Sequence, residues 1–353
     1  LIERLSARGV GGPALGFIYL SHTLGAESGR ILEALSSRLD VTDWVGSLGM
    51  GVCSTGLEVY DEPSIAVLLT DIAPEHYRLI SNQTVDVAGF IAESRDWRNA
   101  TGSTFGVIHG DPSNPRTPDL IPQLAERLDP GFLVGGLTSS SGEQVQFAGM
   151  PHRGGVSGVM LAGDVSVTTG LTQGCSLIGE PHVITECRNN IVVTLDGKPA
   201  LEVLKSSVGE ILARDLQRLG GYIFAALPIA GSDTGDYRVR NLIGLDPNQG
   251  LVAIGDLVEP GQRLQFARRD PQTAHDDLMR MLDNIAERLP GPIRGGLYHS
   301  CLGRGENLFG APSAELQLIE SRLGAFPLIG FYANGEISRD QLYGYTGVLT
   351  LFT

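Results

Sequence analysis

Residues 120–128 read LIPQLAERL, and three other segments of the chain repeat this arrangement of apolar residues. The apolar residues stand at the first, second, fifth and ninth positions, a spacing that places them on one face of a helix. Segments 31–39 and 281–289 keep all four apolar positions, and segment 315–323 keeps the last three. All four segments end in Arg-Leu, and an arginine in the last turn favours the negative end of the helix dipole. The pattern therefore predicts four related helices.

Short apolar runs flank three of these helices. Each repeat has one run before the helix, one after it and one further along. In that order the runs are 15–21, 44–56 and 64–71, then 105–111, 132–142 and 156–164, then 295–301, 326–335 and 345–352. Such runs suit strands that are buried on both faces. A helical crossover predicts that the first and second strands are parallel, and we expect the second and third to form a hairpin. The predicted fold class is α/β, with repeated β-α-β-β units forming mixed sheets flanked by helices.

The rest of the chain is expected to form a second region. A long helix is predicted over 202–219, and strands are predicted at 237–246, 251–257 and 263–270, with turn residues between them. Strand character changes to helix near 197–199, so the best domain boundary lies there.

Composition narrows the class of protein. The chain has 353 residues, 42% of them apolar and 19% charged, which is typical of a globular protein of more than one domain. Its net charge of −14 argues against nucleic acid and anionic membranes as partners. No apolar run approaches the ~18 residues needed for a membrane span, so no membrane insertion is expected. Four separated cysteines without a CxxC pair predict no metal site, reduced thiols and a cytoplasmic protein.

Familiar catalytic and signalling motifs are not visible. There is no P-loop, GxSxG nucleophile turn, EF-hand loop or dinucleotide-binding turn in its usual context, and no kinase, cyclase or receiver motif. If the protein is a sensor, its output is expected on another chain.

The second strand of each repeat runs into a glycine turn beside a glutamate. The three turns are 51-GVCSTGLEV-59 with Glu58, 135-GGLTSSSGEQV-145 with Glu143, and 330-GFYANGEI-337 with Glu336. Glycine permits a positive φ or a close approach by another group. Each carboxylate is open to three interpretations: it binds a ligand ammonium, it pairs with an arginine of the chain, or it is solvated.

Residues 300–305 read SCLGRG and follow the first strand of the third repeat. Ligands of α/β sheets bind beyond the carboxyl ends of parallel strands, where this loop should meet 334-NGEI-337. Arg304 is suited to a ligand carboxylate and Glu336 to an ammonium. The alternative is that these two side chains pair with each other. The predicted ligand-binding residues are Cys301, Gly303, Arg304, Gly305, Asn334, Gly335 and Glu336, with His299, Cys53, Ser54, Gly56 and Glu58 as further candidates.

A cysteine-dependent activity is a further alternative. Arg304 is expected to lower the pKa of Cys301, and His299 lies two residues away. A thiol nucleophile also needs a positioned base and an oxyanion hole, and no such set is legible, so we expect no enzymatic activity.

The glycine turns and loops together resemble those of the FIST family. The matching stretches, which cover nearly the whole chain, are 51-GVCSTGLEV-59, 135-GGL-137, 173-QGCSLIGEP-181, 184-IT-185, 195-LDGKPALEVL-204, 298-YHSCLGRG-305 and 329-IGFYANGEI-337. One departure is that Leu57 separates Gly56 from Glu58, where the family tends to read Gly-Glu.

The resemblance implies a FIST N-terminal region over 1–197 and a FIST C-terminal region over 198–353. It also implies a bacterial sensory domain that binds a small ligand, an amino acid or similar small carboxylate, and signals to a partner such as a histidine kinase on another chain. No cofactor is expected for such a domain. The alternatives are a haem-binding nitric-oxide sensor, a Cys301-dependent enzyme and a protein-interaction scaffold without a small ligand.

Overall fold

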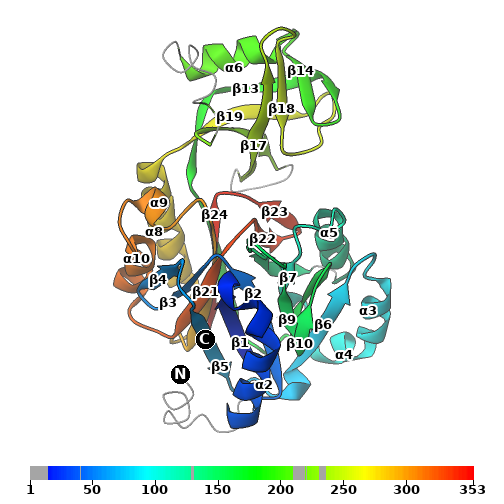
Figure 1. Ribbon diagram of the computed structural model, residues 1–353, viewed down its shortest axis with the longest axis vertical. Coiled ribbons are helices and arrows are strands. Elements are labelled where there is room, and N and C mark those ends of the chain that lie inside the picture. Colours follow the sequence, from blue (N-terminus) through cyan, green and yellow to red (C-terminus); the bar gives the residue numbers. More distant parts are fainter. Residues whose placement is uncertain (1–14, 40, 129–130, 210–218, 220, 230–235) are drawn as a thin grey trace. The chain divides into compact units, whose positions relative to one another are not determined.

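The structure is a computed structural model that describes residues 15–39, 41–128, 131–209, 219, 221–229 and 236–353 (Figure 1). These residues form two compact units. Unit 1 contains the described residues up to Gln173 together with His275–Thr353, and unit 2 is Gly174–Ala274. The predicted boundary between regions 1–197 and 198–353 is a boundary between sequence regions, not between these compact units, and it stays a prediction. No helix in the described ranges is long and apolar enough to span a membrane.

Unit 1 is built from the three predicted repeats. The first repeat consists of β1 (Leu15–Ser21), α2 (Ser28–Leu39), β2 (Asp43–Gly49) and β5 (Ile65–Thr70). The second consists of β7 (Phe105–Gly110), α5 (Thr117–Leu128), β8 (Phe132–Leu137) and β11 (Val156–Leu161). The third consists of β20 (Gly295–Cys301), α10 (Ala314–Leu323), β21 (Leu328–Ala333) and β24 (Thr346–Phe352), and α8 (Pro271–Arg288) precedes it. The first and second strands of every repeat are parallel neighbours, as predicted. The fold class is confirmed, and so are the four related helices.

The predicted hairpin between second and third strands is wrong. The third strand of each repeat instead pairs antiparallel with the first strand, on the side away from the second. Small hairpins at or after the glycine turns explain this difference. Each repeat forms one such hairpin between its second and third strands, and the chain then passes to the far side of the first strand.

These small hairpins are exchanged between repeats around a closed ring. The hairpins are β3 (Gly51–Ser54) with β4 (Leu57–Tyr60), β9 (Gln146–Ala148) with β10 (Met150–His152), and β22 (Glu336–Arg339) with β23 (Gln341–Tyr343). The first repeat gives its hairpin to β21 of the third, the third gives its hairpin to β8 of the second, and the second gives its hairpin to β2 of the first. The hairpin of each repeat therefore completes the sheet of another repeat.

The three sheets enclose one central core and carry helices on their outer faces (Figure 1). Inward-facing residues from all three sheets, such as Phe17, Val107 and Leu297, form a single buried cluster. The alternate residues face outward and pack on the helix of their own repeat. Burial on both faces explains why the strands are almost continuously apolar.

A glycine recurs at the same place in the second strand of each repeat. A Cβ atom on Gly46, Gly135 or Gly330 would lie 1.7–1.8 Å from a carbonyl oxygen of the adjacent first strand. The strands meet at these points too closely for any side chain. This requirement accounts for three of the glycines that stand out in the sequence.

The remaining elements extend this framework. Unit 1 also contains η1 (His22–Glu27), η2 (Pro74–His76), β6 (Tyr77–Gln83), α3 (Ala88–Glu93), α4 (Arg95–Thr101), β12 (Val167–Gln173) and α9 (Glu306–Phe309). Unit 2 contains β13 (Cys175–Arg188), β14 (Ile191–Leu195), β15 (Lys198–Pro199), α6 (Ala200–Val208), β16 (Ile223–Pro228), β17 (Tyr237–Asp246), β18 (Leu251–Ile254) and β19 (Arg263–Arg269). The predicted strands of this region are present. Helix α6 covers the start of the predicted helix 202–219, and residues 210–218 lie outside the described residues.

Candidate functional site

The loop SCLGRG and the turn before Glu336 lie at one edge of the third sheet. Strands β20 and β21 are parallel neighbours whose register pairs Cys301 with Ala333. The main-chain N–H of Leu302 donates to the carbonyl oxygen of Ala333 (3.0 Å), which continues the contact past the ends of the strands. The expected juxtaposition of these two segments is therefore present.

Arg304 is fully buried and forms an ion pair with Glu315, the first buried residue of α10. Its Nε donates to Glu315 Oε1 (2.8 Å), and its Nη2 lies 2.6 Å from the same oxygen. The Glu315 carboxylate also accepts from Tyr298 Oη (2.6 Å), Ser300 Oγ (3.1 Å) and the main-chain N–H of Gly305 (3.2 Å). Burial alone would lower the pKa of Arg304, but the nearby Glu315 charge raises it. The guanidinium therefore stays charged, and its contacts with Glu315 fix the loop on the helix.

This arrangement corrects the alternative that Arg304 pairs with Glu336. Glu336 is fully buried, and its Oε2 accepts from the main-chain N–H (3.1 Å) and hydroxyl (2.8 Å) of Thr346. Burial raises the pKa of Glu336 to about 8, although the Thr346 hydrogen bonds and the nearby Arg304 charge favour ionisation. The charge of Arg304 thus acts on Glu336 only electrostatically, whereas Arg304 forms its ion pair with Glu315.

Three fully buried polar atoms of Arg304 and Glu336 have no hydrogen-bond partner among the described residues. They are Nη1 and Nη2 of Arg304, which are donors, and Oε1 of Glu336, which is an acceptor when the carboxyl is ionised. Nη2 makes the ion-pair contact with Glu315, so Nη1 and Oε1 are the two that lack both an ion pair and a hydrogen bond. Most buried polar atoms in proteins are hydrogen-bonded, and an unsatisfied one costs about 1–3 kcal/mol. The edge therefore has a donor and an acceptor that a bound molecule would satisfy.

The loop itself reaches the surface. Cys301 and Gly303 are half-buried and Asn334 is exposed. Gly303 packs so closely on Tyr345 that an added Cβ would lie 2.8 Å from the ring. Gly335 has a φ of 133° and its carbonyl oxygen accepts from the main-chain N–H of Leu137. Access to the buried atoms would therefore pass the half-buried residues of this loop.

The expected lowering of the pKa of Cys301 is wrong. Burial raises the pKa of this thiol, the Glu336 charge raises it further, and the Arg304 charge opposes them only weakly. The thiol accepts from the main-chain N–H of Gly303 at 3.4 Å. A thiol held in its protonated form gives no support to the nucleophile that the cysteine-dependent alternative needs.

His299 does not share this edge, because its side chain points into the central core. The first strands of the three repeats place Tyr19, His109 and His299 at equivalent positions, and all three are fully buried. The Tyr19 hydroxyl lies 2.7 Å from His299 Nε2 and 3.2 Å from His109 Nε2. Burial lowers the pKa of both histidines, to about 3 for His299. These side chains form a neutral hydrogen-bonded group in the core.

The first glycine turn contributes one of its four predicted residues to the neighbourhood of the loop. Glu58 lies beside Gly305, where an added Cβ would be 2.8 Å from its Oε2. Glu58 accepts from the main-chain N–H of Ser313 (2.7 Å) and from the Tyr332 hydroxyl. Burial raises its pKa, against these two hydrogen bonds. The other three residues lie elsewhere. Cys53 is part of the buried core of the third repeat, Ser54 pairs with β21, and Gly56 lies beside Glu320.

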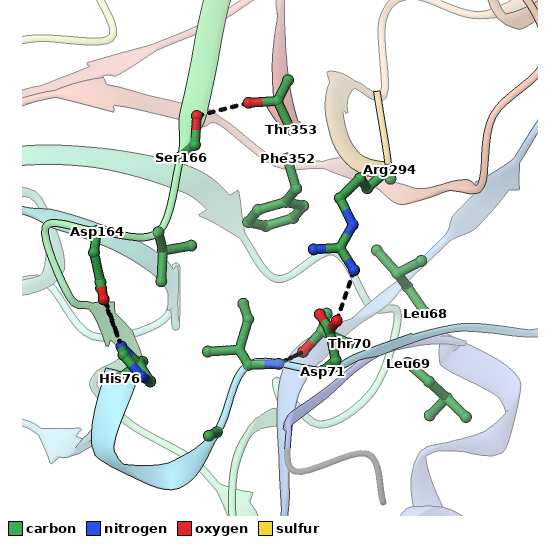
Figure 2. A pocket seen from close by; sticks show the side chains of 14 residues that line it. Leu68, Leu69, Thr70, Asp71, His76, Asp164, Ser166, Arg294, Phe352 and Thr353 are labelled. Carbon is green, nitrogen blue, oxygen red and sulfur yellow. Dashed lines mark hydrogen bonds and ion pairs between the residues drawn. The ribbon is translucent and has the colours of Figure 1, made fainter. Parts of the chain in front are cut away.

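The described residues of unit 1 line two open clefts that bear on the candidate site. A cleft of about 770 Å³ runs between β4 and the loop, and its lining includes Glu58, Leu302 and Glu306. A second cleft, of about 650 Å³, lies where β5, β11 and β24 end and contains none of the predicted residues (Figure 2). Its polar walls are paired internally, with Arg294 to Asp71 at 2.6 Å and His76 to Asp164 at 2.9 Å. Both volumes are within the range of ligand pockets.

Comparison with known proteins identifies the class to which this arrangement belongs. Residues 14–198 match the FIST N domain and residues 200–339 match the FIST C domain. The chain therefore belongs to the FIST family, whose domains are generally sensory domains of signal transduction. An uncharacterized protein of Mycobacterium tuberculosis is 31% identical over 357 residues, which cover 97% of this chain and 92% of that protein. An uncharacterized Mycobacterium bovis protein is 30% identical over 354 residues, covering 96% and 90%.

Proposed function

We propose that this protein is a cytoplasmic bacterial sensor that binds a small carboxylate, most suitably an amino acid, at the edge formed by Cys301–Gly305 and Asn334–Glu336. The proposed output is a change in a partner signalling protein on another chain, such as a histidine kinase. The observation that carries the proposal is the pair of unpartnered buried atoms, Arg304 Nη1 and Glu336 Oε1. A ligand carboxylate would accept from the first and a ligand ammonium would donate to the second.

The ion pair with Glu315 is compatible with this role. Glu315 engages Nε and Nη2 and leaves the Nη1 side of the guanidinium available. A guanidinium carries five N–H donors in a rigid fork, so it can hold a structural carboxylate and a ligand carboxylate at once. Glu315 would then orient Arg304 toward the ligand rather than compete with it.

The proposal is tested by a thermal-shift panel of the twenty amino acids, their 2-hydroxy analogues and haemin. A ligand at about 100 times its Kd adds about 2.7 kcal/mol to the free energy of unfolding, which raises Tm by roughly 5–10 °C. We expect Arg304→Lys, which keeps the charge but loses the fork, to remove the shift. Arg294→Ala in the second cleft is the matched control, and it should keep the shift.

Each result of the panel has a definite reading. A shift that is lost in Arg294→Ala and kept in Arg304→Lys would move the ligand to the cleft of Figure 2 and overturn the assignment. A flat panel with a folded protein would favour the interaction scaffold. A response to haemin alone, followed by its absorption spectrum, would favour the haem sensor.

A further inference from the structure

Glu336 lacks the cation that a buried carboxylate normally requires. No arginine, lysine or histidine of the described residues lies within ion-pair distance of it, and the side chains that hydrogen-bond it, Thr346 and the thiol of Cys301, are neutral. The neighbouring strands place Gly136 and Tyr343 opposite it, and the titratable side chains that act on it from the loop are Arg304 and Cys301. The charge of Arg304 is already balanced by Glu315.

A fully buried carboxylate without a counterion is costly, so such a group takes up a proton instead. The unpartnered Oε1 is consistent with the protonated form, in which this oxygen can carry the hydrogen. The pKa of Glu336, raised by burial to about 8, agrees with the geometry. The thiol of Cys301 also keeps its proton, because burial raises its pKa. In the free protein the edge therefore has one balanced ion pair and two neutral acids.

We propose that ligand binding at this edge is coupled to the release of one proton from Glu336. This inference rests on the proposed function, because it needs a ligand that brings an ammonium to Oε1. The ammonium supplies the missing counterion, so Glu336 ionises and its proton passes to the solvent buffer. The site then holds three ion pairs, namely Arg304 with Glu315, Arg304 with the ligand carboxylate, and Glu336 with the ammonium. The device makes affinity depend on pH and selects ligands with an amino group.

The coupling is measured by isothermal titration calorimetry of the amino acid that gives the largest thermal shift, in phosphate and in imidazole buffer at pH 6.5. The dependence of the heat on the ionisation enthalpy of the buffer gives the number of protons released. We expect about one proton for the wild type and none for Glu336→Gln. Between pH 6 and 7.5 the Kd of the wild type should fall about tenfold per pH unit, because one proton is exchanged. The variant should show no such slope.

Two controls separate the coupling from other ionisations. Glu143→Gln removes an exposed carboxylate of the equivalent turn in the second repeat and should release one proton like the wild type. The 2-hydroxy analogue of the same ligand lacks the ammonium and should bind, if it binds, without proton release. A ¹³C-carboxyl NMR titration of the free protein should show the Glu336 resonance, identified by its loss in Glu336→Gln, in the protonated form at pH 6.5.

Failure of this inference can be told apart from failure of the proposed function. If amino acids bind at Arg304 but release no proton, or if the NMR titration shows Glu336 ionised at pH 6.5, the coupling is wrong and the proposed site stands. If no amino acid binds, the proposed function is wrong and the coupling falls with it.

Discussion

Glu315→Gln tests the buried ion pair that fixes the candidate site. The carboxylate of Glu315 receives Nε and Nη2 of Arg304 and three further donors, from Tyr298, Ser300 and Gly305, with no exposed surface on either charged side chain. Glutamine keeps the shape but removes the charge and replaces one acceptor oxygen by a donor. We expect a loss of about 3–5 kcal/mol in the free energy of unfolding, because a buried guanidinium is left without its counterion.

Urea unfolding, followed by a probe in unit 1, measures this loss, and it corresponds to a fall in Tm of roughly 6–20 °C. Arg304→Met should also destabilise, because it leaves Glu315 buried without a cation. The double variant is the control. If the two side chains act as a pair, it should lose less than the sum of the two single variants, by at least about 1 kcal/mol. A loss below about 1 kcal/mol in Glu315→Gln, or additive single effects, would refute the reasoning.

Three further predictions concern the core. Gly330→Ala should prevent folding, because its Cβ would lie 1.7 Å from a carbonyl oxygen. The control is Gly89→Ala on an open face of α3, which should change the free energy of unfolding by less than about 1 kcal/mol. Soluble yield and Tm are measured for both variants. Tyr19→Phe should cost about 1–3 kcal/mol in urea unfolding, because the histidines lose their shared partner. Burial lowers the pKa values of His109 and His299 in the folded protein below 6.5, so the unfolded state takes up protons first as the pH falls. The free energy of unfolding should therefore decrease below about pH 6.5, by up to about 1.4 kcal/mol per pH unit for each histidine. Urea unfolding at a series of pH values measures this decrease.

The sequence pattern predicts the local elements of unit 1 but not their order in the sheets. Apolar spacing identifies α5 and its relatives, and the helical crossovers predict the parallel strand pairs. Exchange of the small hairpins depends on contacts between residues about 100 or more positions apart, such as Val45 with Ala148 and Cys53 with Gly330. No local pattern encodes which repeat receives a given hairpin, so the predicted β-hairpin connection was wrong.

The sequence carries a signal for the partner of Arg304 that lies outside the glycine-turn motifs. Glu315 stands at the one position of segment 315–323 where the apolar repeat is broken, the position occupied by Leu120 in segment 120–128. A charged residue on the buried face of a helix needs a buried counterion. That requirement points to a nearby cation, and Arg304 is the nearest arginine that precedes the helix. Glu336 was a plausible partner by motif position, but its raised pKa follows from burial, which the motif does not reveal.

The three repeats differ at the strand end that carries the candidate site in the third sheet. At the equivalent strand ends, Ser21 and Asp111 stand where Cys301 stands in the third repeat, and the side chain of Asp111 is used within its own repeat, accepting from Ser113 and Gly154. In the third repeat the same position is followed by Arg304, whose charge is met by a residue of the helix instead of the loop. One scaffold thus carries two different arrangements at equivalent strand ends, a carboxylate held by nearby donors in the second repeat and a loop arginine paired with the helix in the third. The proposed ligand site needs the arrangement of the third repeat, in which Nη1 of Arg304 has no hydrogen-bond partner among the described residues.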